Sequence, residues 1–314
     1  PDDPSIYYTL TGGVTMTHTM HGSVNPIGGE NLVIKHKWGK SAEEIWERRA
    51  FRSIKFALGE NPKVSNMPSS YPISRAGISS IIEASFQKAR QYEKQWQVYR
   101  RKIKQTRKRD RHKILKPRRD IRMEALQDLI KGRAVVRCHS YRAEESLDLI
   151  RLSKQFGFKI AAFEHIHQAY RIADQLAENR IGIWIFADVW NYKTEASEFT
   201  PFGLELLYKK GVLISLNSDT SEIMRRLHME AGKMRRYAGM SDLDALKTIT
   251  LNSAIILGMD RYTGSIEVGK EADLAVFDGH PLSGTSKCVL TMIEGEIYFS
   301  LMKHTEKQPK RSQK

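Results

Sequence analysis

The stretches Ala134-Val-Val-Arg-Cys-His139, Lys159-Ile-Ala-Ala-Phe-Glu-His165 and Val212-Leu-Ile-Ser-Leu-Asn-Ser-Asp219 decide how this chain folds. Each is a short apolar run with the length and character of a buried parallel strand. Helical stretches follow the first two runs, so the chain repeats a strand–helix unit. In a (β/α)8 barrel the C-terminal ends of the strands meet at one mouth, which holds the active site. The pattern therefore predicts an α/β fold of the TIM-barrel type.

His139, His165 and Asp219 each stand at the C-terminal end of a predicted strand. Two imidazoles and a carboxylate that converge there suit zinc or another divalent transition metal, and such an ion indicates metal-assisted hydrolysis. Taken singly, a histidine at a strand end is more often an ordinary hydrogen-bonded residue, and an aspartate there is usually a turn or helix cap. The same placement in three units favours a shared metal site.

The last third of the chain carries three motifs in close succession. They are Ala245-Leu-Lys-Thr-Ile-Thr-Leu-Asn-Ser-Ala-Ile-Ile-Leu-Gly258, Gly264-Ser-Ile-Glu-Val-Gly-Lys-Glu-Ala-Asp-Leu-Ala-Val-Phe-Asp278 and Met292-Ile-Glu-Gly-Glu-Ile-Tyr298. These motifs resemble those of the amidohydrolase superfamily, in its imidazolonepropionase-like branch. Earlier segments resemble the same family, and the whole resemblance covers most of residues 11–300. The earlier segments are residues 12–17, 22–29, 54–63 and 186–193.

The resemblance also implies how the chain is divided. We expect a metal-dependent hydrolase barrel over residues 1–262, the return strands of a small β-sandwich over 263–300, and a basic tail over 301–314. Amidohydrolases usually carry a His-x-His pair at the end of the first barrel strand, just ahead of a Gly-Val-Thr strand. No such pair precedes Gly13-Val14-Thr15 here. The expectation is a barrel that is incomplete at its N-terminus and lacks that strand and its histidine pair.

The resemblance assigns roles to several further residues. His139 and His165 would bind zinc or another divalent ion, and Asp219 would act as the general base. Lys55 is either an ordinary lysine or a carbamylated lysine that bridges two ions, with Glu60 as the alternative carboxylate. A bare ammonium has no lone pair to offer, so only the carbamate could ligate.

Three residues next to these could contact the substrate. Arg142 could bind a substrate carboxylate or an oxyanion, or form only a surface ion pair with Glu145. Tyr141 and Asn217 are the expected substrate-binding residues, and Asn217 could instead orient Asp219 or simply form the turn. The expected reaction is hydrolysis of a carbon–nitrogen bond in a small amide, whether cyclic or linear.

The net charge of +15 comes mostly from one segment. Residues 88–119 hold fifteen Lys or Arg and two acidic residues, and residues 303–314 add five Lys or Arg against one acidic residue. The rest of the chain is therefore close to neutral. Tyr92, Trp96 and Tyr99 follow helical spacing within the basic segment, which predicts a helical insertion over about 86–120 with one aromatic face.

Two other functions stay open at this point. Without the first-strand histidine pair, the barrel could be catalytically inactive and serve as a binding or structural protein. The basic helix could bind nucleic acid or another anionic surface, or it could simply be a solvated helix. The expected partner is a small-molecule substrate, and a homo-oligomer of the chain stays open as well. No apolar run approaches the roughly 18 residues of a membrane span.

Overall fold

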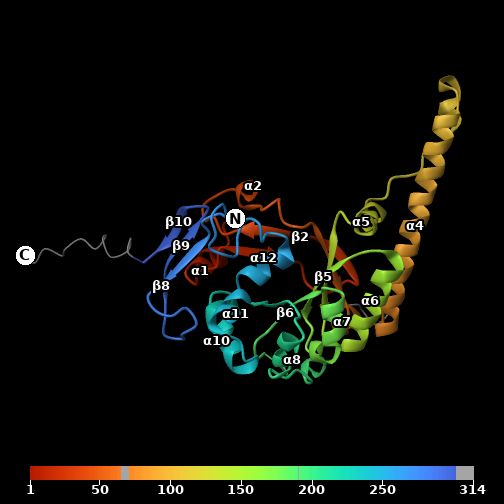
Figure 1. The fold of residues 1–314 in the computed structure, drawn as a ribbon. Coiled ribbons are helices and arrows are strands. Elements are labelled where there is room, and N and C mark those ends of the chain that lie inside the picture. Colours follow the sequence, from red (N-terminus) through yellow and green to blue (C-terminus); the bar gives the residue numbers. More distant parts are fainter. Residues whose placement is uncertain (65–70, 190, 302–314) are drawn as a thin grey trace, which may run out of the picture.

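A curved sheet of seven strands lies at the centre of the molecule (Figure 1). The structure is a computed structural model that describes residues 1–64, 71–189 and 191–301. The strands lie in the sheet in the order in which they occur along the chain. They are β1 (Met16–Thr19), β2 (Ile27–Lys35), β3 (Ser53–Ala57), β4 (Val135–Ser140), β5 (Ile160–His165), β6 (Gly182–Ile185) and β7 (Ile214–Leu216).

The strands β3 to β7 are parallel, as the repeated strand–helix unit predicts. The strands β1 and β2 instead form an antiparallel hairpin, and β2 is also antiparallel to β3. The connection between β1 and β2 is only residues 20–26, too short for the crossover that parallel strands require. Over the described residues the sheet is thus an open half-barrel with β1 and β7 at its ends, and not a closed eight-stranded barrel.

Helices cover the convex face of the sheet and follow its strands in turn (Figure 1). The shorter helices around the hairpin and β3 are α1 (Pro4–Leu10), α2 (Ala42–Ile45) and α3 (Glu60–Val64). The helices between the parallel strands are α4 (Arg75–Gln105), α5 (Ile121–Ile130), α6 (Ala143–Phe156), α7 (Ala173–Glu178) and α8 (Gly203–Lys209). After β7 come α9 (Ser221–Met224), α10 (Leu227–Tyr237), α11 (Asp242–Lys247) and α12 (Leu251–Leu257), and 3-10 turns span Lys108–Lys113, Ala169–Ile172 and Thr194–Ala196.

The two faces of the sheet differ in chemistry. On the convex face Phe56 of β3 and Cys138 of β4 belong to the main apolar core, together with the inward sides of α4 and α6. Successive residues of a strand point to opposite faces, so the residues between them point to the concave face. There Trp184 joins a smaller apolar cluster with residues of α12, and the rest of that face is polar.

A second sheet of three antiparallel strands follows α12, as the resemblance leads one to expect. Its strands are β8 (Leu274–Phe277), β9 (Cys288–Ile293) and β10 (Glu296–Ser300). Lys35 at the end of β2 is 2% exposed, and its ammonium lies 3.1 Å from Asp273 and 3.0 Å from Glu294. These ion pairs attach the first hairpin to the second sheet. The predicted basic tail lies outside the described residues beyond Leu301.

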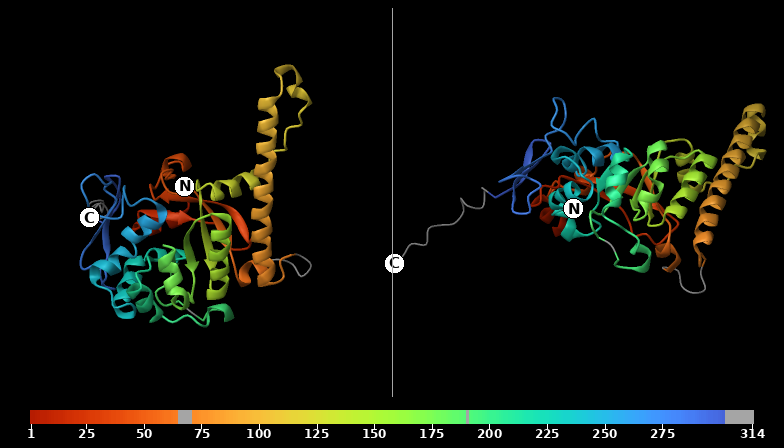
Figure 2. Two further views of the ribbon diagram at one scale, coloured as in Figure 1. Left: turned by 45° about the vertical axis from the view of Figure 1, so that its right-hand side comes forward. Right: turned by 60° about the horizontal axis from the view of Figure 1, so that its bottom comes forward.

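The helix α4 is 31 residues long and projects well beyond the rest of the molecule (Figure 2). Its first half packs on the sheet through Ile78, Ile82 and Phe86, whereas its second half extends outward. The chain then returns to the body alongside it and enters α5. The segment predicted as an insertion, about 86–120, thus includes the outer part of α4 and the 3-10 turn at Lys108–Lys113. None of the described helices combines the length and the apolar character that crossing a lipid bilayer requires.

Candidate metal and active site at the strand ends

The concave face of the sheet carries a row of ionisable side chains. The register pairs Lys55 of β3 with Arg137 of β4, and His139 of β4 with Glu164 of β5. Because residues two apart in a strand share a face, Arg137 and His139 point the same way, toward the inside of the half-barrel. All four residues are buried, with at most 4% of their surface exposed. Charged side chains therefore lie inside the half-barrel, although the apolar pattern of a buried parallel strand predicts only apolar side chains there.

The charges of three of these side chains partly neutralise one another. The Lys55 ammonium lies 2.7 Å from the Glu164 carboxylate, and Arg137 lies close enough to influence that carboxylate as well. Burial raises the pKa of Glu164 and lowers that of Arg137 to about 9, while the opposite charges act against each shift. Arg137 also donates a hydrogen bond of 2.9 Å to the carbonyl of Ile256, and its guanidinium lies 4.6 Å from the Trp184 ring centroid.

His139 lies beside this ion-pair group, nearer the C-terminal ends of the strands. Its ring centroid is 4.9 Å from that of His165 and 4.7 Å from that of Tyr141. Neither ring nitrogen of His139 has a hydrogen-bond partner among the described residues, although both are buried. Burial holds the pKa of His139 well below its usual value, so the ring is neutral near pH 7. A buried imidazole with free lone pairs is the form that binds a metal ion.

His165 and Asp219 meet at the same end of the sheet. The Nε2 atom of His165 lies 3.6 Å from the Asp219 carboxylate, and the Asn217 amide donates a hydrogen bond of 3.1 Å to His165 Nδ1. Both His165 and Asp219 have positive φ, 67° and 47°, which is uncommon outside glycine and often marks functional strand ends. Burial lowers the pKa of His165 to about 3, and the Asp219 side chain remains 67% exposed at the rim.

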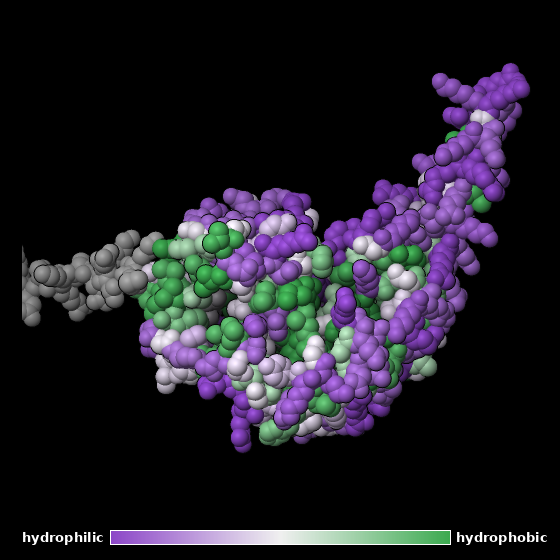
Figure 3. Space-filling model, viewed as in Figure 1, coloured by the Kyte–Doolittle hydropathy of each residue, from purple (hydrophilic) through white to green (hydrophobic). Residues whose placement is uncertain are grey.

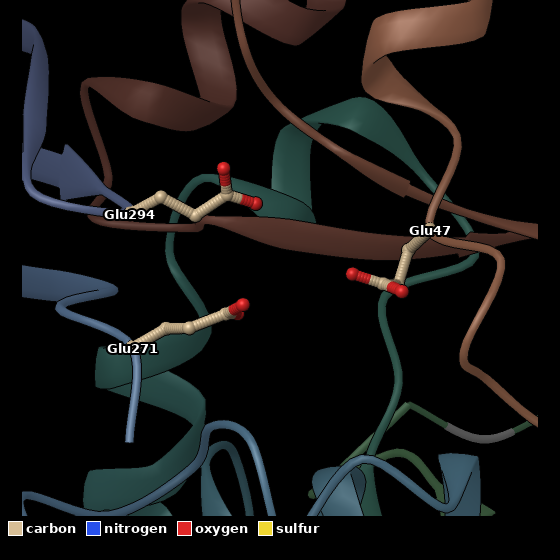
Figure 4. Close-up of side chains that lie close together, drawn as sticks. All are labelled: Glu47, Glu271 and Glu294. Atoms are coloured by element: carbon tan, nitrogen blue, oxygen red, sulfur yellow. The ribbon is translucent and has the colours of Figure 1, made fainter. Parts of the chain in front are cut away.

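The metal-binding atoms of His139, His165 and Asp219 do not all come within 4.8 Å of one another. Among the residues that the structure describes, the group that meets this condition is Glu47, Glu271 and Glu294, whose carboxylates point toward one another (Figure 4). Those carboxylates already bind cations of the chain, since Arg49 joins Glu47 to Glu271 and Lys35 binds Glu271 and Glu294. We therefore interpret the glutamate group as an ion-pair network.

The other predicted site residues fall into two groups. Tyr141 is buried against His139 and His165, and Lys55 faces the same interior. Glu60 begins α3, where its backbone N–H donates a hydrogen bond of 3.1 Å to the Glu195 carboxylate. Arg142 is not brought to the cluster, because it is 43% exposed and pairs with Glu144 instead of the expected Glu145. Glu145 is bound by Arg75 at 2.9 Å.

Sequence reasoning missed several residues of this cluster. His165 and His167 form a His-x-His of their own, and that spacing alone could have identified His167. The His167 ring centroid is 4.8 Å from that of Tyr141, and burial lowers the pKa of His167 to about 4. Tyr192 shares a 2.7 Å hydrogen bond with the Tyr141 hydroxyl, and Lys193 lies 4.1 Å from the Tyr141 ring centroid. Tyr192 and Lys193 lie in a loop, so a rule based on strand ends could not predict them. Residue 190 in the same loop lies outside the described residues.

His18 on β1 is a further residue that the sequence did not place in the site. Its ring centroid lies 5.2 Å from that of Trp184 on β6, across the concave face. Its Nε2 atom is 3.2 Å from the Ser53 hydroxyl, and burial together with the charges of Arg137 and Lys55 lowers its pKa well below the usual value. The first strand thus curls over the same interior that holds Lys55 and Arg137.

Comparisons with known proteins agree with this fold. The model of the Amidohydrolase family matches residues 196–301. The crystal structure of an amidohydrolase from Thermotoga maritima MSB8 superposes with a TM-score of 0.85 and 33% identity, over 95% of this chain and 75% of that one. The chain therefore belongs to the amidohydrolase family.

Two curated relatives resemble the chain over different lengths. Amidohydrolase tasK of Hapsidospora irregularis is 31% identical over 315 residues, which cover 95% of this chain and 32% of that protein. The imidazolonepropionase of Sphingopyxis alaskensis is 33% identical over 82 residues, or 24% of this chain and 19% of that protein. The chain thus spans about a third or less of the length of these relatives.

Proposed function

We propose that this chain forms the core of a metal-dependent hydrolase that cleaves carbon–nitrogen bonds in a small amide. The observation that carries the proposal is His139, which is 2% exposed and whose ring nitrogens have no partner among the described residues. Leaving buried polar atoms unpaired costs free energy, so such atoms in a cleft call for a ligand. His165 and Asp219 lie at the same strand ends, where barrel hydrolases hold their ions.

The donor set fits zinc or another divalent transition metal. His139 and His165 offer neutral nitrogens, and Asp219 offers a carboxylate at the rim. Asn217 lies against the other ring nitrogen of His165, and its amide would have to turn so that its oxygen accepts the Nδ1–H, as outer partners of metal-binding histidines commonly do. An ion held by these residues would supply Lewis-acid activation of water and of the scissile carbonyl. Asp219 would take the proton of the attacking water and deliver it to the leaving nitrogen.

The role of Lys55 depends on how many ions bind. Its ammonium lies 2.7 Å from the Glu164 carboxylate in this structure, so a carbamate on Lys55 would place a second anion beside that carboxylate unless a cation lay between them. We therefore propose that carbamylation accompanies a second ion. Glu60 remains the alternative carboxylate, and Lys55 is otherwise a structural cation. A bound stoichiometry of two ions, raised by added bicarbonate, would support the carbamate, whereas one ion would assign Lys55 to the ion pair alone.

The substrate class follows from the family and from the lining of the site. Tyr141 and Asn217 are the proposed substrate contacts, since both lie against His165. The partial likeness to an imidazolonepropionase favours a cyclic amide. A panel of cyclic and linear amides, assayed for ring opening or amine release with and without added zinc, addresses this choice. The panel should include hydantoin-like rings and N-acyl amino acids.

Metal analysis tests the proposal directly. Elemental analysis and zinc titration of the purified chain should show at least one tightly bound equivalent. The variants His139→Asn and His165→Asn should each bind zinc at least tenfold more weakly. His112→Asn is the matched control, because His112 is an exposed histidine far from the cluster. Unchanged zinc affinity in both site variants would leave the chain as an inactive barrel that serves as a binding protein.

A further inference from the structure

The outer part of the insertion is a separate feature that the proposed hydrolase does not use. We call residues 94–119 the basic arm: the outer half of α4, the 3-10 turn at Lys108–Lys113, and the return segment to α5. In the space-filling view it extends from the body as an almost uniformly hydrophilic projection (Figure 3). The roughly 12 helical residues of the arm span about 18 Å.

The basic arm carries thirteen Lys or Arg and one acidic residue, Asp110, a net charge of +12. All thirteen cations are exposed. Within the described chain, four of them pair with a carboxylate and nine do not. The nine are Lys94, Arg101, Lys102, Lys104, Arg107, Lys108, Arg111, Lys116 and Arg118. A solvated helix ordinarily mixes both signs of charge, so this concentration of unpaired cations indicates an anionic partner.

The helical part of the arm has two distinct faces. Trp96 forms edge-to-face contacts with Tyr92 and Tyr99, at centroid distances of 6.2 and 5.8 Å. Lys116 of the return segment lies 5.8 Å from the Trp96 ring centroid, so the aromatic face is turned toward the returning chain. At 100° per residue, Lys94, Arg101 and Lys104 lie within about 80° on the opposite side. Arg100 and Lys102 flank that outward face on its two sides.

These faces favour one kind of anionic partner over others. Proteins that bind single strands offer exposed aromatic rings for stacking, but here the aromatic rings hold the arm together. Helices that lie on membranes expose a broad apolar face, and among the large apolar side chains of the arm Leu115 alone is exposed. The arm therefore presents a narrow outward face of cations with further cations on both sides. Such a face suits a partner with regularly spaced phosphates.

We propose that the basic arm binds the phosphodiester backbone of double-stranded DNA without sequence preference. B-form DNA carries one charge per about 1.7 Å of axis, so about 18 Å of helix faces about ten phosphates. The major groove of about 12 Å admits one face of a helix, and the flanking arginine and lysine then reach phosphates on either side. The deep, narrow major groove of duplex RNA does not admit a helix, so DNA is the preferred duplex.

The test measures binding of the full chain to a 20-base-pair DNA duplex by fluorescence anisotropy at several salt concentrations. The variant Lys94→Gln/Arg101→Gln/Lys104→Gln should weaken binding at least tenfold at 0.1 M salt. It should also reduce the slope of log K against log salt by about three, one for each phosphate that the variant no longer neutralises. All three positions are exposed, so thermal unfolding should not change.

Two controls assign the effect to the basic arm. Lys154→Gln/Arg236→Gln/Arg261→Gln removes three exposed cations from the body and should leave the DNA affinity within twofold. A second variant, Lys307→Gln/Lys310→Gln/Lys314→Gln, removes the same charge from the basic C-terminal residues and should also retain most of the affinity. Equal losses in either control and the arm variant would overturn the proposal, because the binding would then follow net charge alone.

Competing ligands test whether duplex DNA is the preferred partner of the basic arm. Duplex RNA of the same length and single-stranded DNA should bind more weakly than duplex DNA at equal salt. Vesicles containing phosphatidylserine should not retain the chain at a salt concentration at which DNA still does. Tighter binding to RNA, to single strands or to vesicles would overturn the assignment to duplex DNA. These measurements are independent of any hydrolase activity, so they stand whether or not the metal site is confirmed.

Discussion

Lys55 and Glu164 show how single residues shape the interior of this protein. Their charges are almost fully buried, and the free-energy cost of removing them from water is offset by their 2.7 Å contact and by the neighbouring Arg137. A buried pair of this kind contributes little net stability relative to an apolar pair. It strongly penalises the loss of one partner, because the other charge is then left alone in the interior.

We expect Glu164→Gln to lower the free energy of unfolding by about 3 kcal/mol, since it leaves the Lys55 ammonium without its carboxylate. Lys55→Met should lower the free energy of unfolding by a similar amount, because it leaves the Glu164 carboxylate without its ammonium. The double variant Lys55→Met/Glu164→Gln should lose clearly less than the sum of the two single losses, because neither member of the pair is left without its partner. Urea unfolding of the four proteins gives the coupling energy. Additive losses in the double variant would show that the two side chains do not act as a pair.

The residues of the candidate site differ in how far the sequence could predict them. His139, His165 and Asp219 follow recognisable strands, so the rule that strand ends meet at one mouth was enough to predict their placement. Glu164 and Arg137 lie inside those strands, where an apolar run predicts only core. Tyr192 and Lys193 come from a loop, and their contacts with Tyr141 depend on packing that no local pattern encodes.

Among the elements, helix ends followed their local signals closely. The helix α6 ends where Gly157 takes the left-handed conformation at φ 84°. A capping box at Ser41 begins α2, but the helix covers only Ala42–Ile45. The chain leaves this helix because Trp46 bridges to Ile34 of β2. A long-range contact thus overrides the local preference.

Gly157→Ala should destabilise the protein by about 1 kcal/mol, because an alanine at positive φ brings its Cβ against the following carbonyl. The cost is conformational alone, since no neighbouring atom lies within 4 Å of the position a Cβ would take. Gly22→Ala is the matched control, with equally open surroundings and no positive φ. Thermal melts should separate the two variants by about 1–2 °C. Equal melting temperatures would show that the left-handed cap is not retained in solution.

At the scale of the whole molecule, several buried histidines link stability to pH. Burial lowers the pKa of both His36 and His167 from 6.5 to about 4, and that of His165 to about 3. Their folded pKa values thus lie below the unfolded value. Between these values the unfolded chain binds more protons than the folded chain, so stability is full above about pH 6.5 and is lost as the pH falls toward 4.

We expect the unfolding free energy, measured in urea with a chelator present, to fall by several kcal/mol between pH 7 and pH 4.5. His36 alone can account for about 3 kcal/mol of the total loss at still lower pH, from a shift of about 2.5 pH units. His36→Gln can still bond Thr9 and Thr17, and it removes this titration, so its stability should depend less steeply on pH. Parallel pH profiles for the two proteins would refute the linkage to His36.

The overall architecture was predictable in part. The parallel strands and the second sheet followed from apolar runs and from family motifs, and both are present. The antiparallel hairpin of β1 and β2 was not predicted, because its polar and glycine-rich sequence carries no clear strand period. The curvature that brings His18 over Trp184 is equally invisible in sequence, since it depends on the summed twist of all the strands.

The contacts between the first hairpin and the second sheet have a consequence for the order of folding. Lys35 and Asp273 are 238 residues apart in the chain, and the Thr291 hydroxyl bonds the carbonyl of Leu10, at the end of α1 just before the hairpin, across 281 residues. Contacts at such separation close large loops and form late. During synthesis the parallel strands can assemble before β8 and β9, which the hairpin contacts, have left the ribosome. Until then Lys35 lacks its carboxylates, and we expect the hairpin to be more open to proteases and chaperones than in the complete fold.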